Sequence, residues 1–354
     1  MSYIESVYTE CEDLQARLYD VYTDPTQNKA LQEDRSPFLE FVQSPANTND
    51  LNQIVSPGQG KVRTINLVFD RPILESTVTT ESGRACRAQD KRGDGVATYT
   101  IDTERVFESG ERFALVDFTK KCEANPVFLQ RRLLQHLIAI DKKVATQTAT
   151  EAASLYGDYS ADVISALSLA ADDTLVVQTL DASGQYQAGA MELIQWAADA
   201  SQFGAPAIFS GRLLSEHFRL AMAGCCTQYG VNVAELMSEF GFANAYDRRV
   251  AAAMGAGGLN TRGLLASLGT FQLLTYTENP GAEGMPYFGS NTILMTLVTP
   301  AGVPVDVTIK EDCKVIDIQV QACTKLVALP TDLHEAGDNF AGTNGAAGIL
   351  VTNP

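Results

Sequence analysis

Apolar and polar residues alternate along residues 62–69 and again along residues 99–118, and this pattern predicts a β-strand in each stretch. Residues 74–98, between them, contain only seven apolar residues in 25. Together the three stretches predict one very long hairpin. Such a ribbon is marginal in water, because ordering each residue costs about 1–2 kcal/mol of backbone entropy and little apolar surface is buried in return. The hairpin therefore needs a surface supplied from elsewhere, which favours a protein that contacts copies of itself.

An amphipathic helix is predicted ahead of this hairpin. Apolar residues recur at helical spacing over residues 4–22, and Ser2 and Glu5 fit a capping box. Three Ser-Pro steps and a Gly-x-Gly sequence follow before Lys61, so no regular element is expected there. A helix on an extended tether suggests an N-terminal arm. A helix that folds back on its own domain is the alternative.

A second, much longer helix is predicted after the hairpin. Asn125 and Pro126 supply an N-cap and a first helical residue, and the pattern continues to Tyr156 before Gly157 ends it. The roughly 31 residues would span about 46 Å, almost three times the mean helix length, so a long element should lie beneath them. A coiled coil is the alternative, but regular heptads are never completed. The apolar stripe consists of Leu133, Leu137, Ile140, Val144 and Leu155.

Short alternating elements in an Ala- and Gly-rich composition predict a compact mixed α and β unit over residues 186–291. After it, three alternating stretches predict half-buried strands that pack on one face, most economically on the long helix. The segment beyond Pro330 is rich in Gly, Ala and Asn and is expected to be irregular. The expected helices are 191–200, 210–223 and 231–240, and the expected strands are 205–209, 271–277, 292–298, 303–309 and 315–329.

Composition and charge argue against several classes of protein. The 354 residues are 45% apolar, enough for a sizeable core. The formal net charge of -17, from 26 Lys and Arg against 43 Asp and Glu, argues against a dedicated DNA-binding surface. We expect no secretory signal, no membrane span and synthesis in the cytosol, since the first residues are acidic and no apolar run approaches 18 residues. Seven cysteines at irregular spacing indicate reduced thiols rather than a disulfide framework.

Catalytic motifs are missing from the sequence. The GAGGLN stretch at residues 255–260 resembles a phosphate loop only loosely, because a helical pattern precedes it where a dinucleotide fold has a strand. His136, His217 and His334 lie in separate elements without metal-ligand spacing. Neither a nucleophile elbow nor a metalloprotease motif occurs. We therefore expect no catalytic residue, no cofactor and no metal site.

The order of parts is a tethered N-terminal helix, a long polar hairpin, a long helix opened by Asn125 and Pro126, an Ala/Gly-rich mixed unit and a closing set of strands. This order resembles the major capsid protein of tailed bacteriophages, the Hong Kong ninety-seven fold. Two stretches add to it: APAIFSGRLLSEHFRLAM looks like a strand-to-helix step of the A-domain, and VDVTIKEDCKVIDIQVQACTKLVALP looks like the last P-domain strands. The resemblance implies an α+β fold with an N-arm (residues 1–60), an E-loop (61–122), a P-domain with a spine helix (123–185), an A-domain (186–290), P-domain return strands (291–330) and a C-terminal tail (331–354).

The resemblance also implies a function. Such a subunit forms hexamers and pentamers that close an icosahedral shell around double-stranded DNA, in a virion capsid assembled in the host cytoplasm. The implied partners are other copies of the chain, a portal, a separate scaffolding protein and in some cases a decoration protein, without a membrane and with only nonspecific enclosure of DNA. The candidate residues for subunit contacts are the basic side chains Arg84, Arg87, Lys91, Arg92, Arg131 and Arg132.

Several alternatives stay open at this point. The basic hairpin tip can equally be a solvated turn, since exposed ion pairs contribute about 0–1 kcal/mol. Some family members cross-link subunits through a lysine, but nothing in this sequence identifies a partner for Lys91, so no cross-link is expected. An encapsulin-type shell would share the fold and hold enzyme cargo instead of DNA. A cytosolic α+β enzyme with an unrecognised site is the alternative from a different class.

Overall fold

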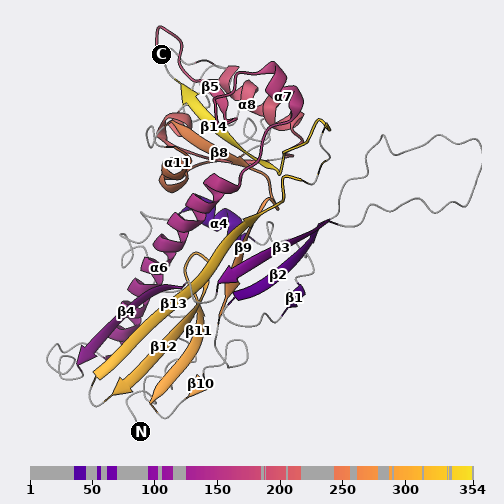
Figure 1. Cartoon of the computed structure of the whole chain (residues 1–354). Coiled ribbons are helices and arrows are strands. Elements are labelled where there is room, and N and C mark those ends of the chain that lie inside the picture. The colour runs from indigo at the N-terminus through magenta and orange to yellow at the C-terminus, as the bar shows by residue number, and fades with distance from the viewer. Residues whose placement is uncertain are drawn as a thin grey trace, which may run out of the picture. The chain divides into compact units, whose positions relative to one another are not determined.

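The computed structural model describes residues 36–44, 54–56, 62–69, 95–102, 106–114, 125–184, 187, 189–204, 206–216, 243–255, 261–277, 287–288, 291–312, 315–332, 334 and 337–352. The chain divides into two compact units, which we call unit 1 (Met1–Pro45, Asp102–Glu151 and Leu273–Leu326) and unit 2 (Ala46–Ile101, Ala152–Gln272 and Val327–Pro354). Their elements are labelled in Figure 1 and confirm the expected α+β class. The predicted helices over residues 4–22 and 231–240 and the hairpin tip lie outside the described residues.

Unit 1 is built on an antiparallel sheet. Its strands follow the order β10-β11-β12-β13-β4, and β9 also pairs with β13. Buried and less buried residues alternate along β11 and β12 and over the first eight residues of β13, as predicted for strands with one face on a core. The strands are β4 (Phe107–Ala114), β9 (Phe271–Tyr276), β10 (Tyr287–Phe288), β11 (Thr292–Val298), β12 (Pro304–Asp312) and β13 (Val315–Ala328).

The long helix α6 covers the apolar face of this sheet. It spans Asn125–Leu155, 31 residues, so its predicted bounds are confirmed. Leu137 and Val144 on the helix share one buried cluster with Val307 and Ile318 on the sheet. Each buried aliphatic side chain of this size contributes about 1.5–3 kcal/mol, so the interface between helix and sheet is the main core of unit 1.

A short helix joins the same core. Helix α4 spans Pro37–Gln43 and buries Phe38, Leu39 and Val42. Ser36 is its N-cap, and the Ser36 hydroxyl accepts a hydrogen bond from the Leu39 N–H at 3.3 Å. The expectation that this Ser-Pro stretch breaks every regular element was therefore wrong. Proline at the first helical position stabilises a helix, because its missing N–H would have had no partner in the first turn.

The turn between β11 and β12 holds a buried carboxyl group. Gly302 adopts a φ of 92°, the left-handed conformation that glycine tolerates best. The neighbouring Ala301 N–H donates to Asp141 Oδ2 of α6 at 3.0 Å, while Asp141 Oδ1 has no hydrogen-bond partner. Burial raises the pKa of Asp141 to about 7, against the lowering effect of the Thr299 and Ala301 hydrogen bonds. The folded chain therefore holds a proton on Asp141 that the unfolded chain releases near pH 4.

We expect this proton to make stability fall as the pH rises. Between about pH 4 and pH 7 the folded state binds more protons than the unfolded state, so the free energy of unfolding decreases over that window, by on the order of 4 kcal/mol at most. Asp141→Asn keeps the shape without the titration and should gain stability over wild type at pH 8 but not at pH 4. Urea unfolding of the unassembled chain at both values measures this. A difference between the two proteins that does not change with pH would contradict the prediction.

Unit 2 contains a mixed sheet of five strands, β5-β14-β8-β6-β7. β14 is parallel to β5 and antiparallel to β8, and β6 is antiparallel to β8 and parallel to β7. Four of the five residues of β8 are fully buried, as in a strand covered on both faces. The strands are β5 (Leu175–Gln178), β6 (Ala207–Ser210), β7 (Ala243–Tyr246), β8 (Arg262–Ala266) and β14 (Ala346–Thr352).

Helices cover both faces of this sheet. Ile194 of α8 shares a core cluster with Leu265 and Ile349, on one face. Met254 of α11 lies 3.2 Å from where a Cβ at Gly348 would be, and Gly348 faces the opposite way from Ile349. The helices are α7 (Ala161–Ala166), α8 (Gly189–Ala200) and α11 (Arg248–Met254), and residues 212–216 are also helical.

Two sequence expectations about this region need correction or refinement. The segment beyond Pro330 is not irregular throughout, because β14 lies between β5 and β8 inside the sheet. Gly157 does follow the end of α6, as predicted, but the reason for a glycine at this position is close packing. A Cβ there would lie 2.5 Å from the Gly342 carbonyl oxygen, and the Gly157 N–H donates to the Asn344 side-chain oxygen at 3.0 Å.

The predicted hairpin is only partly confirmed. β2 (Val62–Phe69) and β3 (Gly95–Asp102) are neighbours in a three-stranded sheet whose third member is β1 (Ile54–Ser56). The prediction of a single long return strand over residues 99–118 was wrong, because β4 does not belong to this sheet and pairs with β13 instead. The Tyr99 hydroxyl donates to the Ala328 carbonyl at 2.6 Å, which fixes the end of β3 within unit 2.

Candidate subunit interface

The predicted contact residues divide into two groups. Arg84, Arg87, Lys91 and Arg92 lie outside the described residues. Arg131 and Arg132 lie in α6, where Arg131 is exposed and Arg132 is half-buried. Only these last two can be placed, and both stay candidates for a subunit contact.

Arg132 belongs to a polar network within unit 1. Its guanidinium forms an ion pair with Glu111 of β4, donating from both Nε and Nη2, and donates to the Gln135 side-chain oxygen at 2.8 Å. The guanidinium carbon also lies 5.9 Å from the centroid of the Phe113 ring. These contacts fix the side chain in one orientation. Arg132 therefore presents a preformed, partly neutralised group rather than a free cation.

His136, one helical turn further on, completes this network. Its Nδ1 lies 2.7 Å from the Ser109 hydroxyl, and its Nε2 lies 3.5 Å from Glu111 Oε2. Burial lowers the pKa of His136, with the Arg132 charge acting in the same direction and Glu111 opposing both. The imidazole is therefore neutral at neutral pH. The network joins β4 to α6, and within it the buried His136 Nε2 has no hydrogen-bond partner.

Several large apolar side chains of the described residues are exposed. Trp196 on α8 is 43% exposed, Tyr246 at the end of β7 is 52% exposed and Leu268 in the turn after β8 is 53% exposed. All three belong to unit 2. Exposed apolar residues occur on any protein, so each matters only where its surroundings fit a partner.

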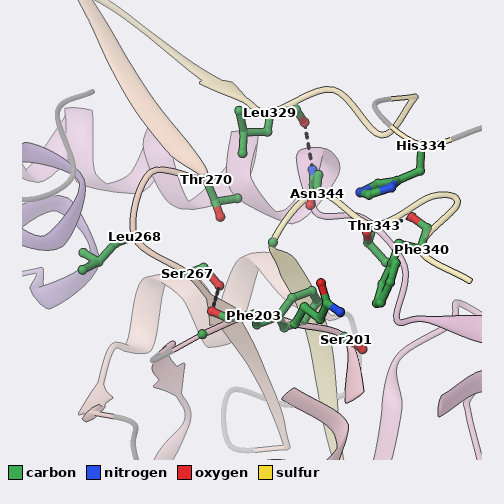
Figure 2. Close-up of a pocket in the computed structure, with 13 residues that line it drawn as sticks. Ser201, Phe203, Ser267, Leu268, Thr270, Leu329, His334, Phe340, Thr343 and Asn344 are labelled. Carbon is green, nitrogen blue, oxygen red and sulfur yellow. Dashed lines mark hydrogen bonds between the residues drawn. The ribbon is translucent and has the colours of Figure 1, made fainter. Parts of the chain in front are cut away.

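Unit 2 also contains a pocket of about 350 Å³. Figure 2 shows Thr270, Phe203, Asn344 and Phe340 around it, with His334 on one side and Leu268 further off. Asn344 is fully engaged: its amide donates to the carbonyls of Leu155 and Leu329, and its oxygen accepts from two backbone N–H groups. These hydrogen bonds fix the Asn344 side of the pocket.

Sequence reasoning missed these unit 2 features for different reasons. Trp196 could have been found, because it falls off the buried stripe of its predicted helix, which Met191, Ile194 and Ala198 form. Tyr246 and Leu268 gave no comparable signal, since their strand and turn were not predicted. In the part of the chain that the structure describes, His, Cys, Asp and Glu side chains form no cluster that could hold a metal ion. No described helix has the length and hydropathy needed to cross a membrane.

Comparisons with known proteins gave matches in structure alone. No protein-family model and no curated protein sequence matches the chain. The mature capsid of bacteriophage PhiM1 matches at a TM-score of 0.41 and 11% identity, over 83% of each chain. The capsid of cyanophage P-SCSP1u matches at 0.43 and 10%, over 87% of this chain and 90% of that one. The head of Helicobacter pylori bacteriophage KHP40 matches at 0.37 and 10%, over 90% and 91%.

The structure therefore matches phage capsid proteins across most of its length at low sequence identity, as the sequence resemblance predicted. The division into N-arm, E-loop, P-domain and A-domain stays a prediction. Because these TM-scores lie below 0.5, we base the functional proposal on the chain's own residues.

Proposed function

We propose that this chain is a structural capsid subunit, which assembles as hexamers and pentamers into an icosahedral shell around double-stranded DNA. One observation carries the proposal. Strands β2 and β3 are neighbours in a small sheet, and the 25 residues that join them, 70–94, are mostly polar and include Arg84, Arg87, Lys91 and Arg92. A connection of this length and composition has little to bury on its own chain, so a second copy is the natural support.

The remaining architecture agrees with a shell subunit. Helix α6 and the sheet of unit 1 form a core with a continuous apolar interface, which gives a stiff body. The opposite face of that sheet carries polar pairs such as Arg112 with Asp317 at 3.1 Å and Gln319 with Glu108 at 2.6 Å. These pairs lie within one chain, and they leave a polar sheet face on which many modest contacts between copies could add up around a closed assembly.

The charge of the chain suits a container for DNA. A net charge of -17 disfavours strong phosphate binding, so packaged DNA can slide as the shell fills. We propose nonspecific enclosure, with a portal and a separate scaffolding protein as further partners; whether a decoration protein also binds is left open. The virion capsid is the proposed location.

Expression of the full chain followed by light scattering and negative-stain microscopy tests this function. We expect closed particles or rings of five and six subunits, and affinity for duplex DNA weaker than about 1 μM at physiological salt. A stable monomer at all concentrations would overturn the proposal. Particles purified from their native source should contain nuclease-resistant DNA. A co-purifying enzyme cargo would favour the encapsulin-type alternative instead.

A further inference from the structure

The polar face of the sheet in unit 1 carries its charges in rows. Strands β11, β12, β13 and β4 lie side by side in this order (Figure 1), and the pairing register places their residues directly opposite one another. Alternate residues of these strands point into the core, so the residues between them share the other face. Across the strands, that face has a basic row, a neutral row and an acidic row. The basic row is Thr292, Lys310, Asp317 and Arg112, the neutral row is Leu294, Thr308, Gln319 and Gly110, and the acidic row is Thr296, Asp306, Gln321 and Glu108.

The charged side chains of these rows are accessible. The Arg112 side chain is 70% exposed and the Asp317 side chain 43%, and Lys310 and Glu108 are also exposed. Arg112 pairs with Asp317, and Glu108 accepts a hydrogen bond from Gln319. Among the described residues, neither Lys310 nor Glu108 has an oppositely charged partner in its own chain. The face therefore offers charges that a partner of the opposite pattern can pair.

The basic and acidic rows lie at equal distances from the neutral row. Lys310 and Asp306 are four residues apart in β12, and Arg112 and Glu108 are four residues apart in β4, so each separation is about 14 Å. Consider a second copy related by a two-fold axis that runs along the neutral row, in front of the sheet. This rotation exchanges the charged rows and places each strand opposite its own counterpart. Lys310 then faces Asp306 of the second copy, and Arg112 faces Glu108 of the second copy.

The charge pattern of this face is thus complementary to itself, which is what an isologous contact requires. Complementary charges fix the register of such a contact and exclude wrong partners more than they add affinity. A shell built from rings needs contacts of this symmetry, because the heterologous contacts that close each ring do not join one ring to the next.

The size of the face suits a contact inside a larger assembly. Four strands about 4.8 Å apart and about eight residues long give roughly 500 Å² per copy, below the roughly 800 Å² per partner of a stable complex. Exposed ion pairs contribute only about 0–1 kcal/mol each. One such contact is therefore weak, but a ring that engages several of them at once holds firmly.

We propose that the polar face of the unit 1 sheet binds the same face of a second copy across a two-fold axis, with Lys310 of each copy paired to Asp306 of the other and Arg112 of each paired to Glu108 of the other. This inference rests on the proposed shell and deepens it by naming a contact that joins neighbouring rings. Each pair occurs twice in the contact, because the axis relates the two copies.

A charge swap tests the pairs. Lys310→Glu places like charges opposite each other twice in every contact, so the subunit concentration for half-maximal formation of closed particles should rise at least about 10-fold, measured by light scattering. Lys310→Glu combined with Asp306→Lys restores opposite charges between copies and should return that concentration to within about threefold of wild type. The two positions are about 14 Å apart within one chain, so a contact between them in the same chain does not explain the rescue.

Lys143→Glu is the matched control. It makes the same change in net charge at an exposed position of α6, which covers the opposite face of the sheet, and should stay within about twofold of wild type. Urea unfolding checks that each variant folds. Arg112→Glu with Glu108→Arg repeats the swap on β4 and decides the matter if Lys310→Glu does not fold.

A cross-link tests the symmetry. Residues on the axis face their own counterparts, so a bismaleimide that spans the roughly 10 Å between packed sheets should join Thr308→Cys subunits in pairs, above the level that the seven natural cysteines give in wild type. No excess of covalent dimers would overturn the two-fold arrangement. The contact is also overturned if Lys310→Glu forms particles as wild type does, if the swaps restore nothing, or if Lys143→Glu loses particles equally. A wild-type chain that stays monomeric would instead overturn the proposed function on which the contact rests.

Discussion

Replacing residues 71–93 by a two-residue Asn-Gly turn should abolish shell assembly while both compact units stay folded. The removed segment contains five basic side chains and few apolar ones, so we expect it to contribute little to a core but much to a contact between subunits. We expect the critical concentration for assembly to rise at least about 100-fold, because linked contacts multiply in a closed shell. Analytical ultracentrifugation measures the assembly, and circular dichroism measures the fold.

A length-matched control distinguishes the effect of the length of the connection from the effect of its side chains. Replacing the same residues by Gly and Ser keeps the connection between β2 and β3 but removes the charged side chains. We expect this variant to fail in assembly as well, because a flexible loop presents no ordered surface. Normal shells from the shortened chain would show that the hairpin tip is not needed. Loss of the folded monomer would show that the tip packs on its own chain, whereas the enzyme alternative requires a folded monomer that no longer turns over substrate.

Leu137→Ala should destabilise the unassembled subunit by about 2–5 kcal/mol. Leu137 is 1% exposed and lies in the cluster between α6 and the sheet of unit 1, where a shorter side chain leaves a cavity. Urea unfolding with an unchanged slope would report the loss directly. The matched control is Lys143→Ala on the exposed side of the same helix, which should change stability by no more than about 0.5 kcal/mol. Equal effects of the two variants would mean that the helix does not pack through this stripe.

The sequence predicts unit 1 well because its elements are long and periodic. Helix α6 carries its apolar stripe from Leu133 to Leu155, about six turns, and β11 to β13 alternate with period two, so neither pattern could be mistaken for the other. The break between β3 and β4 could not be found in the same way. The sequence marks it only by four consecutive polar residues, 102–105, and the register with β13 is what shows that β4 belongs to another sheet.

Unit 2 was harder to predict because its strands are short and buried on both faces. β14 contains AAGILV, a run that lacks alternation and carries Ala and Gly, residues of low strand propensity. β5 and β7 have four residues each, too few for a periodic signal. β5 pairs with β14, more than 100 residues later in the chain, and β7 pairs with β6, 36 residues earlier, so no local pattern contains either pairing.

The candidate contact residues show the same limit. A basic side chain in a sequence indicates a charge but does not identify its partner. Arg132 pairs with Glu111, which lies 21 residues earlier, in β4. The pocket beside Thr270 is assembled from three separate loops, so its existence depends on the strand order that was not predicted. The exposure of Trp196 could have been predicted, because the residue lies outside the buried stripe of its helix.

The position of β14 in its sheet determines when the sheet of unit 2 can be completed during synthesis. This strand follows every other strand of its sheet in the chain, yet it lies between β5 and β8. On the ribosome, the sheet of unit 2 therefore stays split until residues 346–352 have emerged from the exit tunnel.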